Sequence, residues 1–310
     1  MAAPLRVWIE AARLRTLPLA FASILLGSLL AEGRGLFRAD ILALALLTTL
    51  ALQVLSNYAN DLGDTLHGAD HAGRQGPQRA VQQGTISAGQ MRRAVVITSV
   101  VALGAGIGLL WVAFTDWAQL LTFLGLGLLC IAAAILYTNG KRPYGYAGLG
   151  DISVFVFFGW VGVLGTYTLY GARLEAQVGW AAVSAGLLAT GVLNINNLRD
   201  VISDKAAGKY SIPVRLGYAG GKRYHACLVG GALIANLLFT ASAPGHSPYL
   251  YLWMIPAIGL VCHAISIYKL ATPAEADPYL KQLALMALAS DLALGLGYVL
   301  AQRYPAGLGF

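Results

Sequence analysis

Charged residues are scarce in this sequence. Only 11% of the 310 residues are Asp, Glu, Lys or Arg, whereas 57% are hydrophobic, and the mean hydropathy is +0.66. A water-soluble domain of this length needs more charged surface, so the composition excludes that class. The sequence instead predicts an integral membrane protein with several helices.

Cysteine is also rare. Cys130, Cys227 and Cys262 lie in apolar segments, and their spacing fits neither a zinc site nor a disulfide framework. We expect them to be small packing residues. The sequence also contains no soluble segment with a face rich in Lys and Arg, so the net charge of +7 does not indicate nucleic-acid binding.

Long apolar segments fill most of the chain, and each is about as long as the roughly 20 residues that cross a bilayer. We therefore predict an all-α membrane protein in which residues 1–310 form one domain. The nine predicted spans are about 16–32, 40–58, 94–114, 118–138, 150–170, 178–197, 224–242, 249–270 and 283–301.

The basic residues predict an orientation. If the N-terminus is cytoplasmic and the nine spans alternate, 17 of the 21 Lys and Arg residues fall inside. Cytoplasmic loops carry such an excess of positive charge. Two long polar loops, at about 59–93 and 198–223, then lie on the cytoplasmic side. The basic residues left outside are Arg34, Arg38, Arg173 and Arg303.

The first polar loop contains a candidate metal site. Asp61 and Asp64 share one helical face directly after an apolar run, where carboxylates need a cationic partner. Two carboxylates beside the amide of Asn60 suit Mg²⁺, which shares its coordination sphere with phosphate oxygens. Arginines near such a metal can bind the same phosphates. The predicted diphosphate contacts of this stretch are Asn57, Asn60, Arg74 and Arg79.

The second polar loop repeats the pattern. Asp200 and Asp204 again share a helical face, and the spacing from Asp204 to Gly208 equals that from Asp64 to Gly68. We infer a duplicated four-helix unit, about 16–138 and 150–270, followed by the last helix at 283–301. The predicted Mg²⁺ ligands are Asn60, Asp61, Asp64, Asp200 and Asp204. Further predicted diphosphate contacts are Tyr137, Arg142, Asn197, Arg199 and Lys209. Lys141 is predicted to be a catalytic residue together with the four aspartates named above.

Other interpretations of these residues stay open. The acids and bases can form salt bridges among lipid headgroups, and the segment Tyr137–Tyr144 can be an interfacial belt of aromatic and basic residues. A secondary transporter also has many helices and internal symmetry, but its polar groups should lie near the membrane midplane. A membrane phosphotransferase also uses aspartates with Mg²⁺, but its DGxxAR-type run is missing.

Three segments resemble the UbiA superfamily of intramembrane aromatic prenyltransferases: NYANDLGD, YTNGKR and NNLRDVISDKAAGK. The resemblance covers nearly the whole chain. It implies a nine-helix bundle with a central cavity that uses Mg²⁺ to transfer a polyprenyl group from its diphosphate to an aromatic acceptor. It also implies that the catalytic residues are Asp61, Asp64, Lys141, Asp200 and Asp204.

Two further segments, GADHAGRQGPQRAVQQGTIS and GKYSIPVRLG, are most similar to the branch that prenylates 1,4-dihydroxy-2-naphthoate with decarboxylation in menaquinone synthesis. The resemblance implies a bacterial inner-membrane protein with a cytoplasmic active site. Many relatives carry a third acid where this chain has Gly68, and the next acid here is Asp70. An acceptor such as 4-hydroxybenzoate stays an alternative. The prenyl chain length, the metal count, the oligomeric state and the roles of His67 and Asp291 stay open.

Overall fold

The structure is a computed structural model, and it describes residues 3–70, 78–243, 245 and 247–305. Within these residues the regular structure is entirely helical. Nine helical segments of the described chain are long and apolar enough to cross a membrane. The predicted fold class is therefore confirmed, while the cytoplasmic position of the N-terminus stays a prediction.

Several of the nine segments are built from more than one helix. The first half of the chain contains α1 (Leu5–Ala12), η1 (Leu14–Thr16), α2 (Leu17–Gly33), α3 (Ala39–Leu66), α4 (Ala88–Ala113) and α5 (Trp117–Leu136). The fifth segment joins α6 (Gly150–Val154), the π-helix η2 (Phe155–Gly165) and α7 (Thr166–Leu169). The remaining elements are α8 (Ala176–Arg199), α9 (Val201–Ala206), α10 (Ile212–Ala241), η3 (Pro248–Tyr251), α11 (Met254–Lys269), η4 (Pro273–Ala276) and α12 (Asp277–Arg303).

The polar loops are shorter than the sequence predicted. Helix α3 continues to Leu66 and therefore carries both acids of the first motif. Helix α10 begins at Ile212 rather than near 224, and it bends at Gly217, whose φ of 74° is left-handed. Hydropathy locates the apolar part of a helix, but a helix can extend into the aqueous layer without changing that signal.

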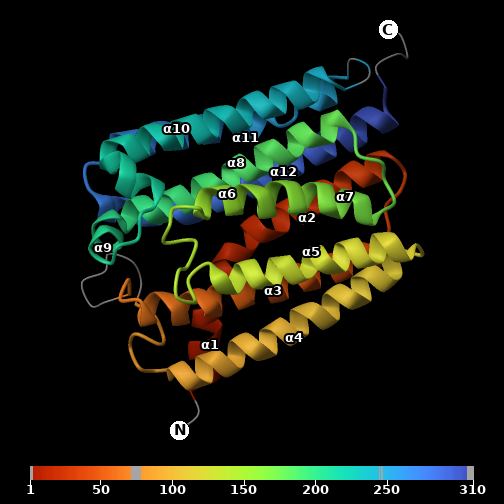
Figure 1. Cartoon of the computed structure of the whole chain (residues 1–310). Helices are drawn as coiled ribbons and strands as arrows, with labels where there is room; N and C mark the ends of the chain where they lie inside the picture. Colours follow the sequence, from red (N-terminus) through yellow and green to blue (C-terminus); the bar gives the residue numbers. More distant parts are fainter. Residues whose placement is uncertain (1–2, 71–77, 244, 246, 306–310) are drawn as a thin grey trace.

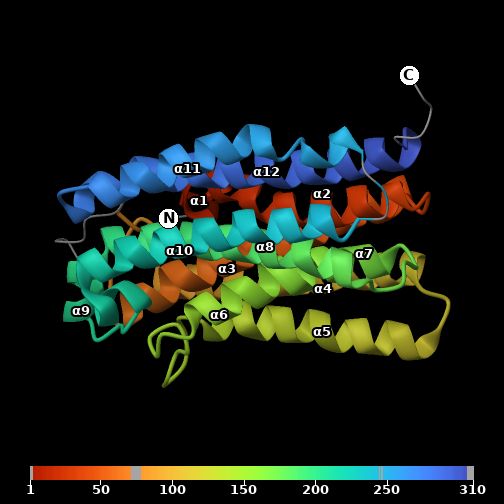
Figure 2. The same cartoon turned by 90° about the horizontal axis from the view of Figure 1, so that it is seen from above.

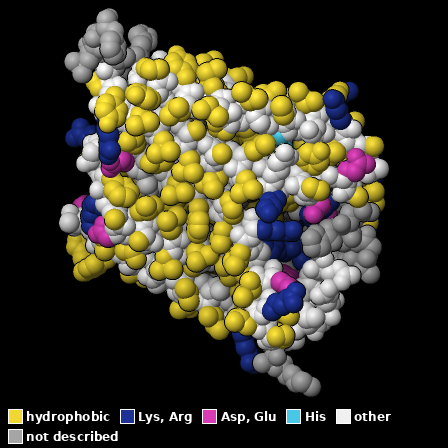
Figure 3. Space-filling view, turned by 180° about the vertical axis from the view of Figure 1, so that it is seen from behind, with side chains coloured by type: hydrophobic (Ala, Val, Ile, Leu, Met, Phe, Trp, Pro, Cys, Tyr) yellow, Lys and Arg dark blue, Asp and Glu magenta, His cyan; other side chains and the backbone are white. Residues whose placement is uncertain are grey.

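The long helices lie side by side, and their polar connections gather at one end of the bundle (Figures 1 and 2). That end, on the left of Figure 1, holds α9 and the C-terminal ends of α3, α5 and α8; α1 also lies next to α3. Helix α12 ends at the opposite end. Figure 3 shows hydrophobic side chains over the middle of one face and charged side chains at its two ends, as a bilayer requires.

Small residues allow the central helices to pack closely. A Cβ atom on Gly159 of η2 would lie 2.5 Å from the Ala182 carbonyl oxygen of α8. Likewise, a Cβ on Gly186 of α8 would lie 2.8 Å from the Phe155 carbonyl oxygen of η2. Close backbone contact at small residues is how helices associate in lipid, where the hydrophobic effect does not draw them together.

Candidate active site

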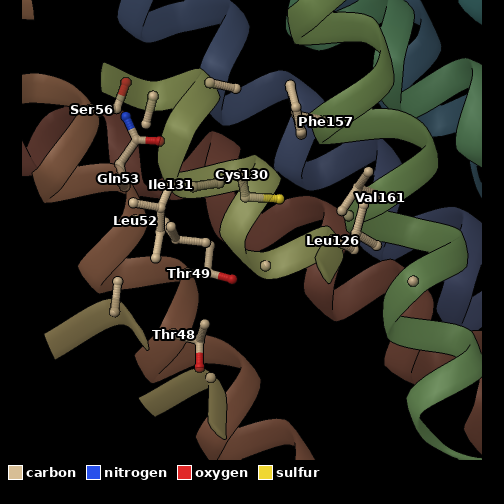
Figure 4. Close-up of a pocket in the computed structure, with 18 of the residues that line it drawn as sticks. Thr48, Thr49, Leu52, Gln53, Ser56, Leu126, Cys130, Ile131, Phe157 and Val161 are labelled. Carbon is tan, nitrogen blue, oxygen red and sulfur yellow. The ribbon is translucent and has the colours of Figure 1, made fainter. Parts of the chain in front are cut away.

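A cavity of about 390 Å³ lies between α2, α3, α4, α5 and η2. Its wall is apolar over most of its length, with Leu126 and Phe157 among the lining side chains (Figure 4). Asn57, Asn60 and the loop after α5 line the end that points toward the polar connections. The cavity therefore joins a hydrocarbon-lined interior to the part of the molecule that carries the acidic motifs.

The last turns of α3 hold the first acidic motif in a buried position. The two carboxylate oxygens of Asp61 accept the backbone N–H groups of Ala80 at 3.1 Å and Val81 at 3.2 Å. One oxygen of Asp64 accepts the Tyr146 hydroxyl at 3.0 Å. Both acids thus meet neutral donors, and neither forms a salt bridge with any residue that the structure describes.

The two acidic motifs end in the same backbone geometry. After α3, the N–H of Ala69 donates to the Asp64 carbonyl at 2.9 Å, and Gly68 has a φ of +77°. After α9, the N–H of Lys209 donates to the Asp204 carbonyl at 2.8 Å, and Gly208 has a φ of +72°. These are Schellman-type helix ends, which favour glycine in the left-handed position. The repeated aspartate-to-glycine spacing therefore reflects a shared local structure, while the larger four-helix duplication stays a prediction.

Residues from three segments meet in what we call the ionic cluster, which consists of Asp64, Tyr146, Asp204 and Lys209. The Lys209 ammonium lies 3.6 Å from an Asp204 oxygen and 5.7 Å from the centre of the Tyr146 ring. Burial alone would lower the pKa of Lys209, but the charges of Asp64 and Asp204 outweigh it and raise the pKa above its ordinary value. Burial, together with the same two carboxylates, raises the pKa of the Tyr146 hydroxyl. Lys209 is therefore a permanent cation between the two motifs.

Asp200 is engaged by a buried arginine instead. Arg199, only 1% exposed, donates from Nε at 2.9 Å and from NH2 at 2.7 Å to the two Asp200 oxygens. Its NH1 donates to Asp277 at the start of α12 at 2.6 Å. Arg199 therefore forms a bidentate pair with Asp200 and a further ion pair with Asp277, and these contacts fix the end of α8 against α12.

The predicted asparagines occupy three different surroundings. Asn57 donates to the Ala12 carbonyl at 2.8 Å and so fastens α3 to the end of α1. Asn60 lines the cavity, and its side-chain oxygen accepts the Thr138 hydroxyl at 3.2 Å. Asn197 is 2% exposed, and its buried side-chain oxygen has no hydrogen bond with any described residue. The three amides therefore border the acidic motifs without forming one shared network.

The predicted basic residues and Tyr137 are spread more widely. Tyr137 lines the cavity and interacts electrostatically with Lys209, so it lies between the cavity and the ionic cluster. Lys141 and Arg142 are exposed in the loop that follows α5. Arg79 is buried and lies 3.4 Å from Asp70, while Arg74 falls outside the described residues.

Two residues that the sequence analysis did not single out form direct contacts with residues of the acidic motifs. Tyr146 joins the ionic cluster from the loop after α5, within a segment rich in tyrosine and glycine that gave no sign of a contact with Asp64. Asp277 reaches Arg199 from 78 residues away. Only the packing of α12 against α8 brings that pair together, so no local pattern could have indicated it.

The family model for the UbiA prenyltransferase family matches residues 20–290 of this chain. The chain belongs to this family. It is 45% identical over 297 residues to a 1,4-dihydroxy-2-naphthoate octaprenyltransferase of Escherichia coli (strain K12), covering 96% of each chain. The family resemblance predicted from the sequence is confirmed.

Solved structures agree with the fold. An apo UbiA homologue from Aeropyrum pernix K1 superimposes with a TM-score of 0.65 at 18% identity, covering 91% of this chain and 96% of that one. A UbiA homologue from Archaeoglobus fulgidus, bound to DMAPP and Mg²⁺, gives a TM-score of 0.57 at 16% identity, covering 91% and 99%. At these identities the likeness establishes the fold alone.

Proposed function

We propose that this protein transfers a polyprenyl group from polyprenyl diphosphate to 1,4-dihydroxy-2-naphthoate with loss of the carboxyl group, a step of menaquinone biosynthesis. The C–O bond between the prenyl carbon and the diphosphate breaks, and a C–C bond forms to the ring carbon that bears the carboxylate. Carbon dioxide and pyrophosphate leave, and the electrons of the broken C–C bond restore the aromatic ring. The full-length similarity to a naphthoate octaprenyltransferase supports this acceptor.

One observation carries the proposal: the ionic cluster lies beside the polar end of an apolar cavity. Asn60 and Tyr137 line that cavity, and Tyr137 also interacts with Lys209 of the cluster. A prenyl diphosphate has the same division between a charged head and a hydrocarbon tail. The cavity shields the allylic cation from water, and the faces of aromatic side chains such as Tyr137 stabilise positive charge.

The described residues suit Mg²⁺ through the chemistry of their donors. No group of three His, Cys, Asp or Glu side chains within them is arranged to hold a metal ion by itself. Mg²⁺ does not require such a group, because it keeps waters and takes one or two carboxylates together with substrate phosphate oxygens. The residues that would hold Mg²⁺ are Asp61, Asp64 and the Asn60 oxygen in the first motif and Asp200 and Asp204 in the second. When bound, Mg²⁺ neutralises the diphosphate and makes it a better leaving group.

The protein's own cations complete the proposed diphosphate site. Lys209 is buried and stays charged, so it can bind a phosphate oxygen and stabilise the leaving pyrophosphate. Tyr146 orients the Asp64 carboxylate by donating to it. Arg199 fixes the direction of Asp200 through a bidentate pair. The predicted phosphate contacts of Arg74, Arg79, Lys141, Arg142 and Asn197 belong to the same proposal.

We further propose that the polar end of the bundle faces the cytoplasm of a bacterium and that the protein lies in the inner membrane. If the predicted spans alternate from a cytoplasmic N-terminus, 17 of the 21 Lys and Arg residues fall on the cytoplasmic side, in agreement with the positive-inside rule. A single cysteine placed at exposed Lys205, in a background without the three native cysteines, tests this. A membrane-impermeant maleimide should label it in inverted vesicles and not in intact cells.

The activity is tested with purified protein in nanodiscs, octaprenyl diphosphate and Mg²⁺. Dihydroxynaphthoate and 4-hydroxybenzoate are offered in parallel, and mass spectrometry follows the product. We expect a prenylated, decarboxylated naphthoquinol that disappears with EDTA and returns when Mg²⁺ is added.

The other outcomes separate the competing functions. Product from 4-hydroxybenzoate alone would retain the reaction type and overturn the acceptor. No product from either acceptor, beside an active control enzyme, would overturn the prenyltransferase proposal and favour a carrier of anionic solutes.

A further inference from the structure

The α3 wall of the cavity differs chemically from the wall formed by α4, α5 and η2. Helix α3 lines it with Thr49, Gln53 and Ser56, which lie on one face at helical spacing. In the membrane-spanning part, α4, α5 and η2 contribute apolar or small side chains and Cys130. Figure 4 shows the α3 residues on one side of the cavity and Leu126, Phe157 and Val161 on the other. Binding of a hydrocarbon tail alone does not explain why the α3 wall carries polar side chains.

Gln53 is the most polar side chain of this wall within the apolar interior. Its Nε2 donates to the Thr16 hydroxyl oxygen at 3.1 Å, and the Thr16 hydroxyl in turn donates to the Arg13 carbonyl at 2.9 Å. The amide is therefore held by its nitrogen at the junction between α1 and α2. Among the described residues, nothing donates a hydrogen bond to the Gln53 Oε1, although the side chain lines the cavity.

A neighbouring threonine satisfies its hydroxyl hydrogen within its own helix. The Thr48 hydroxyl donates to the Leu44 carbonyl of its own helix at 2.8 Å, which satisfies it without a ligand. Polar groups in a membrane interior are costly when unsatisfied, and they mark binding sites or polar pathways. The Gln53 oxygen can therefore accept a hydrogen bond from a donor that enters the cavity.

The position of Gln53 along α3 fits binding of the aromatic acceptor substrate rather than of the diphosphate. It lies 11 residues before Asp64 on α3, a rise of about 16 Å along the helix axis. A diphosphate held at the ionic cluster is too far away to be bound by Gln53. The space between them is lined by Ser56, Asn57 and Asn60, where the reacting carbon of the prenyl chain and an aromatic ring would meet.

We infer that Gln53 binds the aromatic acceptor, its Oε1 accepting a hydrogen bond from a ring hydroxyl on the edge that points away from the diphosphate. This inference rests on the proposed function. The acceptor then lies along the α3 wall, and the prenyl chain lies along the apolar wall of α4, α5 and η2. The cavity thereby separates its two substrates by polarity, and the hydroxyl is recognised because the Gln53 oxygen has no other partner.

The test compares Gln53→Met with Thr16→Val. Both variants lose the hydrogen bond between Gln53 and Thr16, but only Gln53→Met loses the Oε1 acceptor. We expect Gln53→Met to raise the KM for dihydroxynaphthoate by about 10-fold, the worth of one hydrogen bond, with the KM for octaprenyl diphosphate changed by less than about 2-fold. Thr16→Val should raise the acceptor KM by less than about 3-fold.

A second readout isolates the hydroxyl itself. Naphthoates that lack either the 1- or the 4-hydroxyl are measured as competitors of dihydroxynaphthoate in wild type and in Gln53→Met. Wild type should bind one of them about 10-fold more weakly than the diol, and Gln53→Met should abolish that difference. If Gln53→Met does not fold, Gln53→Asn, which keeps the amide but withdraws it by one methylene, should show the same loss in part.

The outcomes distinguish this inference from the proposed function. An inactive wild type overturns the proposed function. An active wild type with an unchanged acceptor KM in Gln53→Met overturns the inference alone. Equal losses in Gln53→Met and Thr16→Val, or an equal rise in both KM values, would mean that Gln53 only holds the helix junction.

Discussion

The two acidic motifs have the same helix ends but different hydrogen-bond and ion-pair partners. In the first, Asp61 accepts two backbone N–H groups and Asp64 accepts a tyrosine hydroxyl. In the second, Asp200 is paired with Arg199, and Asp204 lies beside Lys209. The carboxylates of the first motif therefore form no salt bridge with a described residue, although the charge of Lys209 also acts on Asp64. The carboxylates of the second motif are paired directly with Arg199 and Lys209.

This difference suggests a division of labour within the proposed reaction. A divalent cation gains most where carboxylates keep their full charge, which is the first motif. A diphosphate gains most where buried cations are already in place, which is the second. The first motif should then determine the Mg²⁺ requirement and the second the affinity for the prenyl diphosphate.

The largest expected effect follows from Asp64→Asn. The change removes a buried carboxylate that is a proposed Mg²⁺ ligand and that forms no salt bridge with a described residue, so we expect kcat/KM to fall by at least about 100-fold. The Mg²⁺ concentration for half-maximal activity should rise as well, as a titration of activity against free Mg²⁺ will show. Asp204→Asn should lower activity with a smaller rise in that concentration.

A matched control is available on the same helix. Asp40→Asn lies at the opposite end of α3, where the exposed carboxylate pairs with Arg38. It should leave activity within about 2-fold of wild type, because such exposed pairs contribute little. Equal Mg²⁺ dependence in Asp64→Asn and Asp204→Asn would remove the proposed distinction between the motifs.

Lys209→Met tests the second motif. Removal of the buried cation should raise the KM for the prenyl diphosphate by roughly 10- to 100-fold, because a charged contact to phosphate is lost. Loss of one partner of a buried ion pair should also lower the free energy of unfolding by about 3–5 kcal/mol. Lys205→Met, exposed on α9, is the control. An unchanged KM would place Lys209 outside the diphosphate site.

The same lysine predicts a pH dependence of stability. Asp64 and Asp204 raise its folded-state pKa above the ordinary value of 10.5. A group whose pKa is raised on folding contributes stability that is complete below the unfolded pKa and is lost as the pH rises through the folded pKa. The stability difference between wild type and Lys209→Met should therefore be constant up to about pH 10 and shrink above it. Thermal unfolding in detergent across this range measures it, and a difference that grows with pH would contradict the assignment.

The sequence was sufficient for the fold and for the two acidic motifs but not for how they meet. Long apolar runs depend on composition alone, so all nine spans were predictable. The repeated aspartate-to-glycine spacing was visible because a helix end is a local structure. The contacts of Tyr146 with Asp64 and of Asp277 with Arg199 depend on packing between distant segments. The exposure of Lys141 and Arg142 could not be predicted either, because the residue types of a basic segment do not show whether its side chains are buried.

Tyr146→Phe sharpens the account of the first motif. It removes only the hydroxyl that donates to Asp64, and a hydrogen bond to a charged group contributes about 1.5–3 kcal/mol. We expect kcat to decrease by about 10-fold. The Mg²⁺ requirement should not rise, because Asp64 loses a hydrogen-bond donor that competes with Mg²⁺ for its negative charge. Tyr218→Phe, whose hydroxyl donates to the Thr272 carbonyl, is the control for loss of a phenol. A rise in the Mg²⁺ requirement would mean that Tyr146 helps to hold the carboxylate for the metal.

The smallest expected effect belongs to Asp277→Asn in the second motif. Arg199 would lose one partner but keep both Asp200 oxygens and the Asn196 side-chain oxygen. Asp277 is 39% exposed at its side chain, so solvent already screens the pair and the loss should be at most about 1 kcal/mol. Activity should fall by less than about 3-fold, and thermal unfolding should shift by a few degrees at most. A loss as large as that of Lys209→Met would show that α12 fixes the diphosphate site through Arg199, and the second motif would then depend on the last helix rather than on its own ion pairs.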